Sequence, residues 1–156
     1  MPKVRHALHI ARPREALFAL SQSYALRAEW DPFVREIRFL DGAETPAVGV
    51  RVWVRARDGR EMTVRYVSYW PPDLAAVKMT DGPSRFSAFG GVWRFTAVSE
   101  SATEVVFEYG FRTRPKWLRP VVDRVVSRRL KRDILDRLTA LKRAAEGTDI
   151  LDRLPA

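Results

Sequence analysis

Residues 114–147 read RPKWLRPVVDRVVSRRLKRDILDRLTALKRAAEG, and this stretch decides the fold. Its apolar residues recur at steps of three and four, which predicts one long amphipathic helix. The apolar stripe consists of Leu118, Val122, Val126, Leu130, Ile134, Leu138, Leu141 and Ala145. The other faces carry arginines that we expect to be solvated, namely Arg119, Arg124, Arg128, Arg129, Arg132, Arg137 and Arg143. A single long helix has to bury its stripe against another layer of the fold.

The segments before this helix alternate apolar and polar residues, which indicates that the other layer is a sheet. Strand patterns cover residues 3–11, 37–40, 48–55, 62–70, 75–79, 85–98 and 103–113. Asp58-Gly59 predicts a two-residue hairpin turn, and Gly90-Gly91 predicts a bulge or a sharp bend within a strand. Two short helices are expected after the first strand, one opening at Arg12-Pro13 and one around Ala25–Trp30. This order predicts an α+β fold, in which a curved antiparallel sheet of six to seven strands wraps around the long C-terminal helix.

Length and composition indicate one globular domain. The chain has 156 residues, 46% of them hydrophobic, and no cysteine. We expect the domain to span residues 1–147, with a C-terminal tail at 148–156. The lack of cysteine excludes disulfides, thiol nucleophiles and cysteine metal sites. The sequence has no apolar run of about 18 residues and no leader pattern after Met1, so we expect a cytoplasmic protein.

The charge is strongly basic and concentrated near the C-terminus. The net charge is +9, and residues 112–153 contribute +7 of it, with 13 Lys or Arg against 6 Asp or Glu. A solvated arginine-rich surface accounts for this charge, and peripheral contact with an anionic membrane is the alternative. We expect no nucleic acid partner, because single-strand binding also needs exposed aromatic residues, and the aromatic residues here are assigned to the interior.

Several stretches together resemble a known superfamily. The first strand ends in Ile10-Ala11-Arg12-Pro13, and Glu29-Trp30-Asp31-Pro32-Phe33-Val34 comes near the second helix. With the leucines of the terminal helix, these residues resemble the SRPBCC superfamily of START and birch-pollen-allergen-like proteins, and within it the polyketide cyclase/dehydrase-like family. The resemblance covers roughly residues 3–147. It implies a helix-grip fold with a hydrophobic cavity between sheet and helix, but no single catalytic set, because members include enzymes, carriers and receptors.

A set of mainly aromatic residues is spread over the elements that would surround such a cavity. Aromatic walls provide a large apolar area of fixed shape, and they suit a flat or elongated apolar ligand. The candidate ligand-binding residues are Trp30, Phe33, Tyr66, Trp70, Trp93, Tyr109, Phe111, Trp117, Val121 and Val125. Plain core packing is the alternative for most of them. Tyr66 and Tyr109 are the preferred cavity residues, because an inward hydroxyl group needs a partner.

Catalytic residues are not identified by any motif. His6 and His9 lie on opposite faces of the first strand, because the step between them is odd. We therefore expect no metal site, and no cofactor. His6, Tyr66 and Tyr109 are the candidates for proton transfer, although His6 also fits an ordinary core or edge position. Asp31 could hold a ligand hydroxyl group or act as a base, or it could simply end a helix before Pro32.

Three functions remain open on the sequence. The first is the binding of a small hydrophobic molecule, such as a polyketide, lipid, isoprenoid or quinone, for carriage or sensing. The second is a polyketide cyclase, aromatase or dehydratase activity, in which the cavity shape positions a reactive chain. The third is a membrane- or protein-associated adaptor that uses the basic C-terminal helix. The protein is expected to be a monomer or a homodimer.

Overall fold

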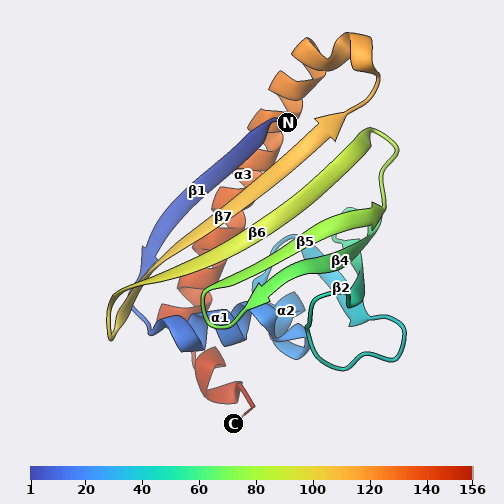
Figure 1. The fold of residues 1–156 in the computed structure, drawn as a ribbon. Helices are drawn as coiled ribbons and strands as arrows, with labels where there is room; N and C mark the ends of the chain where they lie inside the picture. Colours follow the sequence, from blue (N-terminus) through green and yellow to red (C-terminus); the bar gives the residue numbers. More distant parts are fainter. Residues whose placement is uncertain (156) are drawn as a thin grey trace.

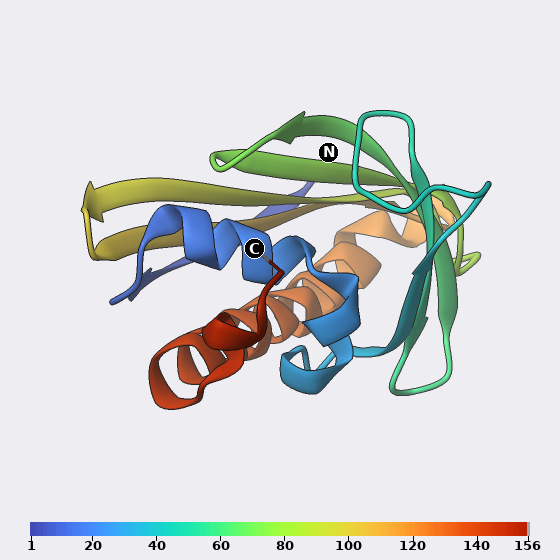
Figure 2. The ribbon, with the colours of Figure 1, turned by 90° about the horizontal axis from the view of Figure 1, so that it is seen from below.

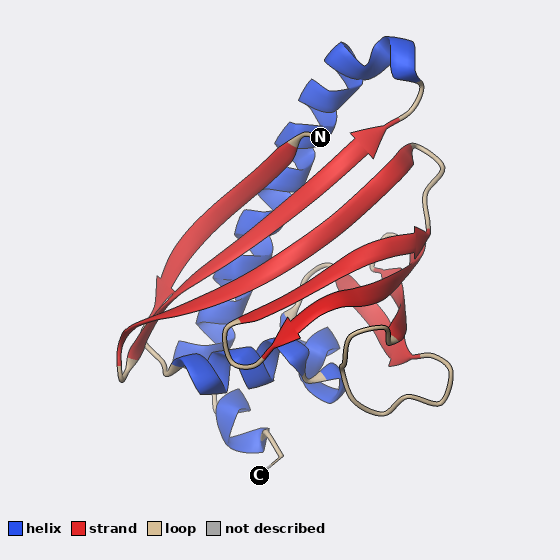
Figure 3. Ribbon diagram, in the orientation of Figure 1, coloured by secondary structure: helices blue, strands red, loops and turns tan. Residues whose placement is uncertain are grey.

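The computed structural model describes residues 1–155, which form one curved sheet and a layer of helices (Figures 1 and 3). The strands are β1 (Lys3–Ile10), β2 (Val34–Phe39), β3 (Arg51–Ala56), β4 (Glu61–Trp70), β5 (Leu74–Asp81), β6 (Phe86–Ser99) and β7 (Ala102–Thr113). The helices are α1 (Arg14–Gln22), α2 (Tyr24–Trp30), η1 (Lys116–Leu118), α3 (Arg119–Gly147) and η2 (Ile150–Arg153).

All seven strands belong to one sheet with the order β1-β7-β6-β5-β4-β3-β2. Every neighbouring pair is antiparallel. Figure 2 shows the sheet above the helices, with the β2–β3 end turning down beside them. The predicted fold class is therefore confirmed: the fold is α+β, and a curved antiparallel sheet grips a long C-terminal helix after two short helices.

The curl of the sheet does not come from a bulge at Gly90-Gly91. Pairing between β6 and β7 continues without a shift through both glycines, so that part of the prediction is wrong. Register shifts occur instead within β2–β3, within β4–β5 and near both ends of β6–β7. The third strand also begins later than predicted, at Arg51, because Gly49 has a left-handed φ of 90° and belongs to the preceding loop. Bulges such as those at the register shifts increase the local twist and bend the strand that carries them.

The buried side chains of α3 begin at Leu130. Leu130, Ile134, Leu138, Leu141 and Ala145 are buried in the core, and α3 contacts β1 and β7. Only η1 and the first turns of α3 run past the end of the sheet (Figure 1). The predicted stripe residues before Leu130 are therefore only partly covered or exposed, and Val126 is the one among them that packs against the core.

Two further features concern the ends of helices. Helix α2 ends at Trp30, and Asp31 caps it with an extended backbone, because the ring of Pro32 disfavours a helical residue in front of it. After α3, Ile150 of η2 is buried in the core and Arg153 pairs with Glu29. Within residues 1–155, no helix combines the length and the apolar character that a membrane span requires.

Candidate ligand-binding cavity

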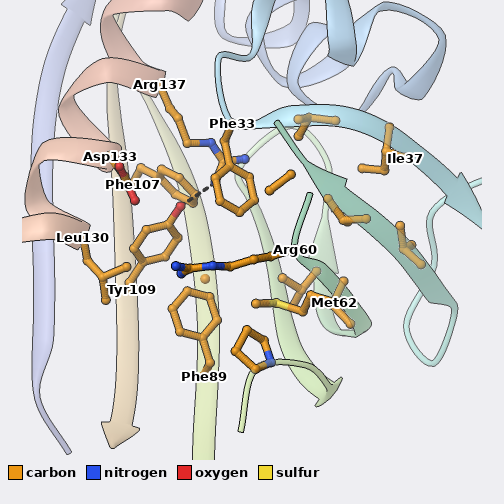
Figure 4. Close-up of a pocket in the computed structure, with 18 of the residues that line it drawn as sticks. Phe33, Ile37, Arg60, Met62, Phe89, Phe107, Tyr109, Leu130, Asp133 and Arg137 are labelled. Atoms are coloured by element: carbon orange, nitrogen blue, oxygen red, sulfur yellow. Dashed lines mark hydrogen bonds between the residues drawn. The ribbon is translucent and has the colours of Figure 1, made fainter. Parts of the chain in front are cut away.

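A cavity of about 420 Å³ lies between the inner face of the sheet, α2 and α3. Figure 4 shows its lining side chains converging from strands and from α3. The apolar part of the wall includes Phe33, Ile37, Val52, Val54, Met62, Val64, Val77, Phe86, Phe89, Trp93, Phe107 and Leu130. Tyrosines and charged residues also line the cavity, but most of its wall surface is apolar, which is usual for a small-molecule site.

Strands β6 and β7 provide the aromatic floor of the cavity. Trp93 is opposite Phe107 in the register, and their rings stack with centroids 3.9 Å apart. Tyr109 is opposite Gly91 and contacts the Phe107 ring edge-on at 4.8 Å. A Cβ atom on Gly91 would lie only 3.5 Å from both Phe107 and Tyr109, so the glycine leaves room above these two rings. Residues two apart on a strand share a face, which explains why these rings gather.

A buried group of three charged residues closes the end of the cavity near α2. Asp31 is fully buried and accepts hydrogen bonds from Arg27 Nε at 2.8 Å and from Arg137 Nη2 at 2.8 Å. Arg137 Nε also donates to both carboxylate oxygens of Asp31, and the Phe33 backbone N–H donates to Oδ1 at 3.0 Å. Arg27 and Arg137 line the cavity in front of Asp31. We call Arg27, Asp31 and Arg137 the charged triad.

The charged triad carries one positive charge in excess. Burial by itself would raise the pKa of Asp31, but Arg137 and Arg27 outweigh that effect and hold its pKa below the ordinary value. Asp31 therefore stays ionised and neutralises only one of the two arginines. Arg137 also lies over the rings of Phe107 and Phe33, at 4.7 and 5.0 Å from their centroids. A buried net charge is costly unless it is paired, so the excess charge favours an electron-rich ligand group in the cavity.

Tyr109 connects the charged triad to the cavity. Its hydroxyl oxygen accepts a hydrogen bond from Arg137 Nη1, drawn dashed in Figure 4. Burial raises the pKa of Tyr109, so the hydroxyl group keeps its proton. Among residues 1–155, no acceptor for that proton is found. A ligand oxygen in the cavity would supply one.

A second polar group consists of Gln22, Tyr24 and Tyr66, which also line the cavity. The Tyr66 hydroxyl group donates to Gln22 Oε1 at 2.6 Å and pairs with the Tyr24 hydroxyl group. Because Tyr66 gives its proton to Gln22, Tyr24 is the donor in the tyrosine pair. Burial raises the pKa of both tyrosines. Each tyrosine proton of this group therefore has an acceptor within the group, whereas the proton of Tyr109 has none among the described residues.

The rim of the cavity is basic. Arg60 extends across the cavity between Tyr109 and Phe89 (Figure 4). Arg85 and Arg129 line the same side, and Arg85 Nε is a buried atom without a partner among the described residues. Burial lowers the pKa of Arg85, and the like charges of Arg60 and Arg129 lower it further. Asp133 is half-buried at the rim, and burial raises its pKa.

The structure brings five of the ten candidate binding residues to the cavity. Phe33, Tyr66, Trp93, Tyr109 and Val125 line it. Trp30 and Phe111 are buried in the core outside the lining, and Trp70, Trp117 and Val121 are exposed. Trp70 is exposed at the end of β4, whereas Trp117 and Val121 lie on the part of η1 and α3 that runs past the sheet.

His6 lies on β1, outside the cavity, with its ring Nδ1 near the Ala7 backbone. His6 pairs with Phe107 in the β1–β7 register, but β1 is an edge strand of the sheet, and His6 is not among the residues that line the cavity. Among residues 1–155, no group of three or more metal-ligating side chains is present.

The sequence reasoning missed the arginines of the charged triad. Arg137 was expected to be solvated, yet it lies three residues after Ile134 and four before Leu141, on the buried face of α3. That spacing is the feature of the sequence that places Arg137 on the buried face. Arg27 lies four residues before Asp31 on α2, the spacing of a helical ion pair. Asp31 both caps the end of the helix and pairs with the two arginines, so the structural interpretation of Asp31 accounts for all its contacts.

Comparison with known proteins identifies the family. The sequence model of the polyketide cyclase / dehydrase and lipid transport family matches residues 1–146. The chain belongs to this family. The resemblance to the SRPBCC superfamily is thereby confirmed. No functionally curated protein is detectably similar in sequence.

Solved structures with the same fold include proteins of different kinds. An aromatase/cyclase from Streptomyces sp. R1128 is 20% identical, with a TM-score of 0.70 over 94% of this chain and 99% of that one. A START superfamily protein from Mycobacterium smegmatis is 12% identical, with a TM-score of 0.73 over 94% and 99%. The two-domain aromatase/cyclase StfQ of the steffimycin pathway is 17% identical, with a TM-score of 0.76 over 92% of this chain and 50% of that one. At these identities the likeness establishes the fold.

Proposed function

We propose that the protein binds one small, mainly apolar molecule in the cavity and holds an oxygen of that molecule against Tyr109. The observation that carries the proposal is an apolar cavity that ends on a buried, net-positive triad. Tyr109 presents an unused proton there, and its oxygen accepts from Arg137. Polyketide-, lipid- and isoprenoid- or quinone-like molecules fit this chemistry, because each joins an apolar skeleton to carbonyl or hydroxyl oxygens. A volume of about 420 Å³ is in the usual range for small-molecule sites.

Cyclase or dehydratase activity is the second candidate, and the contact between Arg137 and Tyr109 favours it. A tyrosine whose oxygen accepts from a cation is a stronger donor to a ligand carbonyl. Such a donor stabilises negative charge that develops on the carbonyl oxygen when a neighbouring carbon loses its proton. The fixed aromatic floor would hold a flexible chain in a reactive shape. The aromatase/cyclase structures of the same fold support this candidate.

Dye binding tests the cavity. N-phenyl-1-naphthylamine is a neutral apolar probe, and 1-anilinonaphthalene-8-sulfonate adds acceptor oxygens. Val77→Trp fills the cavity from β5 and should abolish binding of both dyes. Val67→Trp places the same side chain on the exposed face of β4 and should leave both unchanged. Equal effects of the two substitutions would contradict the proposal.

Tyr109→Phe tests the polar end. Loss of one hydrogen bond should weaken sulfonate binding about three- to tenfold, with the neutral dye unaffected. Tyr69→Phe, outside the cavity lining, is the matched control. Native mass spectrometry of freshly purified protein would then give the mass of any retained ligand and the oligomeric state. Conversion of an added polyketide-like chain to a product of lower mass would decide for the enzyme. A cytoplasmic location stays a prediction.

A further inference from the structure

An exposed apolar row marks the start of α3, away from the core. Trp117 is 78% exposed, Val121 is 66% exposed and Val125 is 63% exposed. Trp117 belongs to η1 and Val121 to the first turn of α3, and these elements extend beyond the sheet (Figure 1). Val125 lies one turn further along α3, at the edge of the cavity. Large apolar side chains that are exposed together indicate an interaction surface.

The same segment holds most of the net charge of the protein. Residues 112–132 contain nine Lys or Arg residues and one Asp, a net charge of +8 out of +9 for the chain. The single acid, Asp123, accepts a hydrogen bond from the Thr113 hydroxyl group. Val121, Arg124, Val125 and Arg128 follow one another at steps of three, one and three, so they share one face of the helix. Arg124 and Arg128 are exposed.

We propose that this face of η1 and α3, made of Trp117, Val121, Arg124, Val125 and Arg128, docks the protein on the surface of an anionic membrane. Tryptophan is favoured at the membrane–water interface, where its ring reaches the acyl region and its N–H stays hydrated. Basic residues beside it are attracted to anionic headgroups. A helix with interleaved apolar and basic residues lies in the plane of such a surface.

Other occupants fit the face less well. A second copy of the chain would bring two segments of charge +8 together, and like charges across an interface are strongly unfavourable. Nucleic acid would pair with the arginines, but it would leave Val121 and Val125 in water. An anionic lipid surface provides both partners together, because its headgroups attract the arginines and its acyl region accepts the apolar side chains.

The docking face adjoins the cavity. Val125 belongs to the exposed row and also lines the cavity, together with Val126 and Arg129 of the next turn. Docking would bring this rim to the lipid headgroups. If the proposed function holds, an apolar ligand could then pass between membrane and cavity with little exposure to water. The docking proposal itself does not require that the cavity be filled.

Vesicle sedimentation tests the proposal directly. We expect binding to vesicles of phosphatidylcholine with about 30% phosphatidylglycerol, and much weaker binding to pure phosphatidylcholine. Binding to the anionic vesicles should decrease as salt rises, because exposed charges are screened. Equal binding to both vesicle types, or none to either, would overturn the proposal.

Substitutions separate the apolar and basic contributions. Arg124→Gln with Arg128→Gln should weaken partitioning about thirtyfold, from about 1 kcal/mol for each basic residue near the surface. Trp117→Ser should weaken it roughly tenfold and remove the quenching of tryptophan emission by brominated lipid. Trp70→Ser is the matched control, since Trp70 is 69% exposed on β4, at the other end of the sheet. Arg65→Gln with Arg94→Gln is the control for charge.

Three outcomes would overturn the proposal. One is equal loss of binding in the control variants, which would show a nonspecific charge effect. Another is a concentration-dependent dimer that Trp117→Ser dissolves, which would assign the face to a second copy. The third is binding to single-stranded DNA but not to vesicles. The cavity variant Val77→Trp should keep vesicle binding, so failure of the ligand proposal and failure of the docking proposal remain distinguishable.

Discussion

Replacement of Asp31 by Asn should destabilise the protein strongly, although the two side chains have nearly the same size. The substitution removes the single negative charge of the charged triad. Arg27 and Arg137 then remain as two buried positive charges without a counter-ion. The Asn carbonyl oxygen can still accept from the Phe33 backbone N–H, so the end of α2 is kept.

The expected loss follows from the burial of all three side chains. Removal of one partner from a buried ion pair costs about 3–5 kcal/mol, because the remaining charge is neither solvated nor paired. We expect that loss in the free energy of unfolding at neutral pH. For a chain of this size, each kcal/mol lowers the melting temperature by about 2–4 °C, so the melting temperature should fall by about 6–20 °C.

Urea unfolding followed by circular dichroism measures the change, with Asp41→Asn as the control. Asp41 forms a two-bond pair with Arg51, with both distances 2.8 Å, but both side chains are largely exposed. Its φ is 57°, a left-handed value that Asn tolerates. Surface ion pairs contribute little, so this variant should unfold almost like the parent protein.

A second substitution tests the sign of the charge effect. Arg137→Met should destabilise the parent protein, because it leaves the Tyr109 oxygen and part of Asp31 without a donor. In the Asp31→Asn background the same change removes an uncompensated charge, so it should stabilise. The reasoning would be refuted if Asp31→Asn and Asp41→Asn had similar effects, or if Arg137→Met destabilised both backgrounds equally.

Two other predictions concern acid stability and the inner strands. Because the pKa of Asp31 is lower in the folded protein than its ordinary value of 3.8, its stabilisation is complete above about pH 4. It is lost as the pH falls further through the folded-state pKa. The difference in unfolding free energy between parent and Asp31→Asn should therefore shrink below about pH 4, and a difference independent of pH would contradict this assignment. Gly90→Ala should lower the melting temperature more than Gly91→Ala, because a Cβ atom at Gly90 would lie 2.9 Å from the Val77 carbonyl oxygen, against 3.5 Å from ring atoms at Gly91. Thermal unfolding of both variants checks the order, and a larger loss for Gly91→Ala would contradict it.

Local patterns were enough to predict the elements of this fold. Apolar and polar residues alternate within the strands, and apolar residues recur at steps of three and four in α3. Both periods reflect which side chains face inward, and both can be seen in the sequence. The late start of β3 was not predicted, because apolar alternation continues through Gly49 into a loop. The register in which the strands pair could not be predicted from local patterns either. The bulge or bend was therefore assigned to Gly90-Gly91 and not to the positions where the register shifts.

The layers, the amphipathic helix and the family could be predicted from the sequence, because each depends on local periodicity or on motifs of residues that are close in the chain. Only the tertiary structure decided which charges are buried. Asp31 and Arg137 are 106 positions apart, and their contact exists because the sheet brings α2 against the buried half of α3. The tertiary structure also explains why Val121 and Val125 are exposed, because the first turns of α3 extend past the end of the sheet. A stripe of apolar residues predicts a buried face only where another layer of the fold lies beneath it.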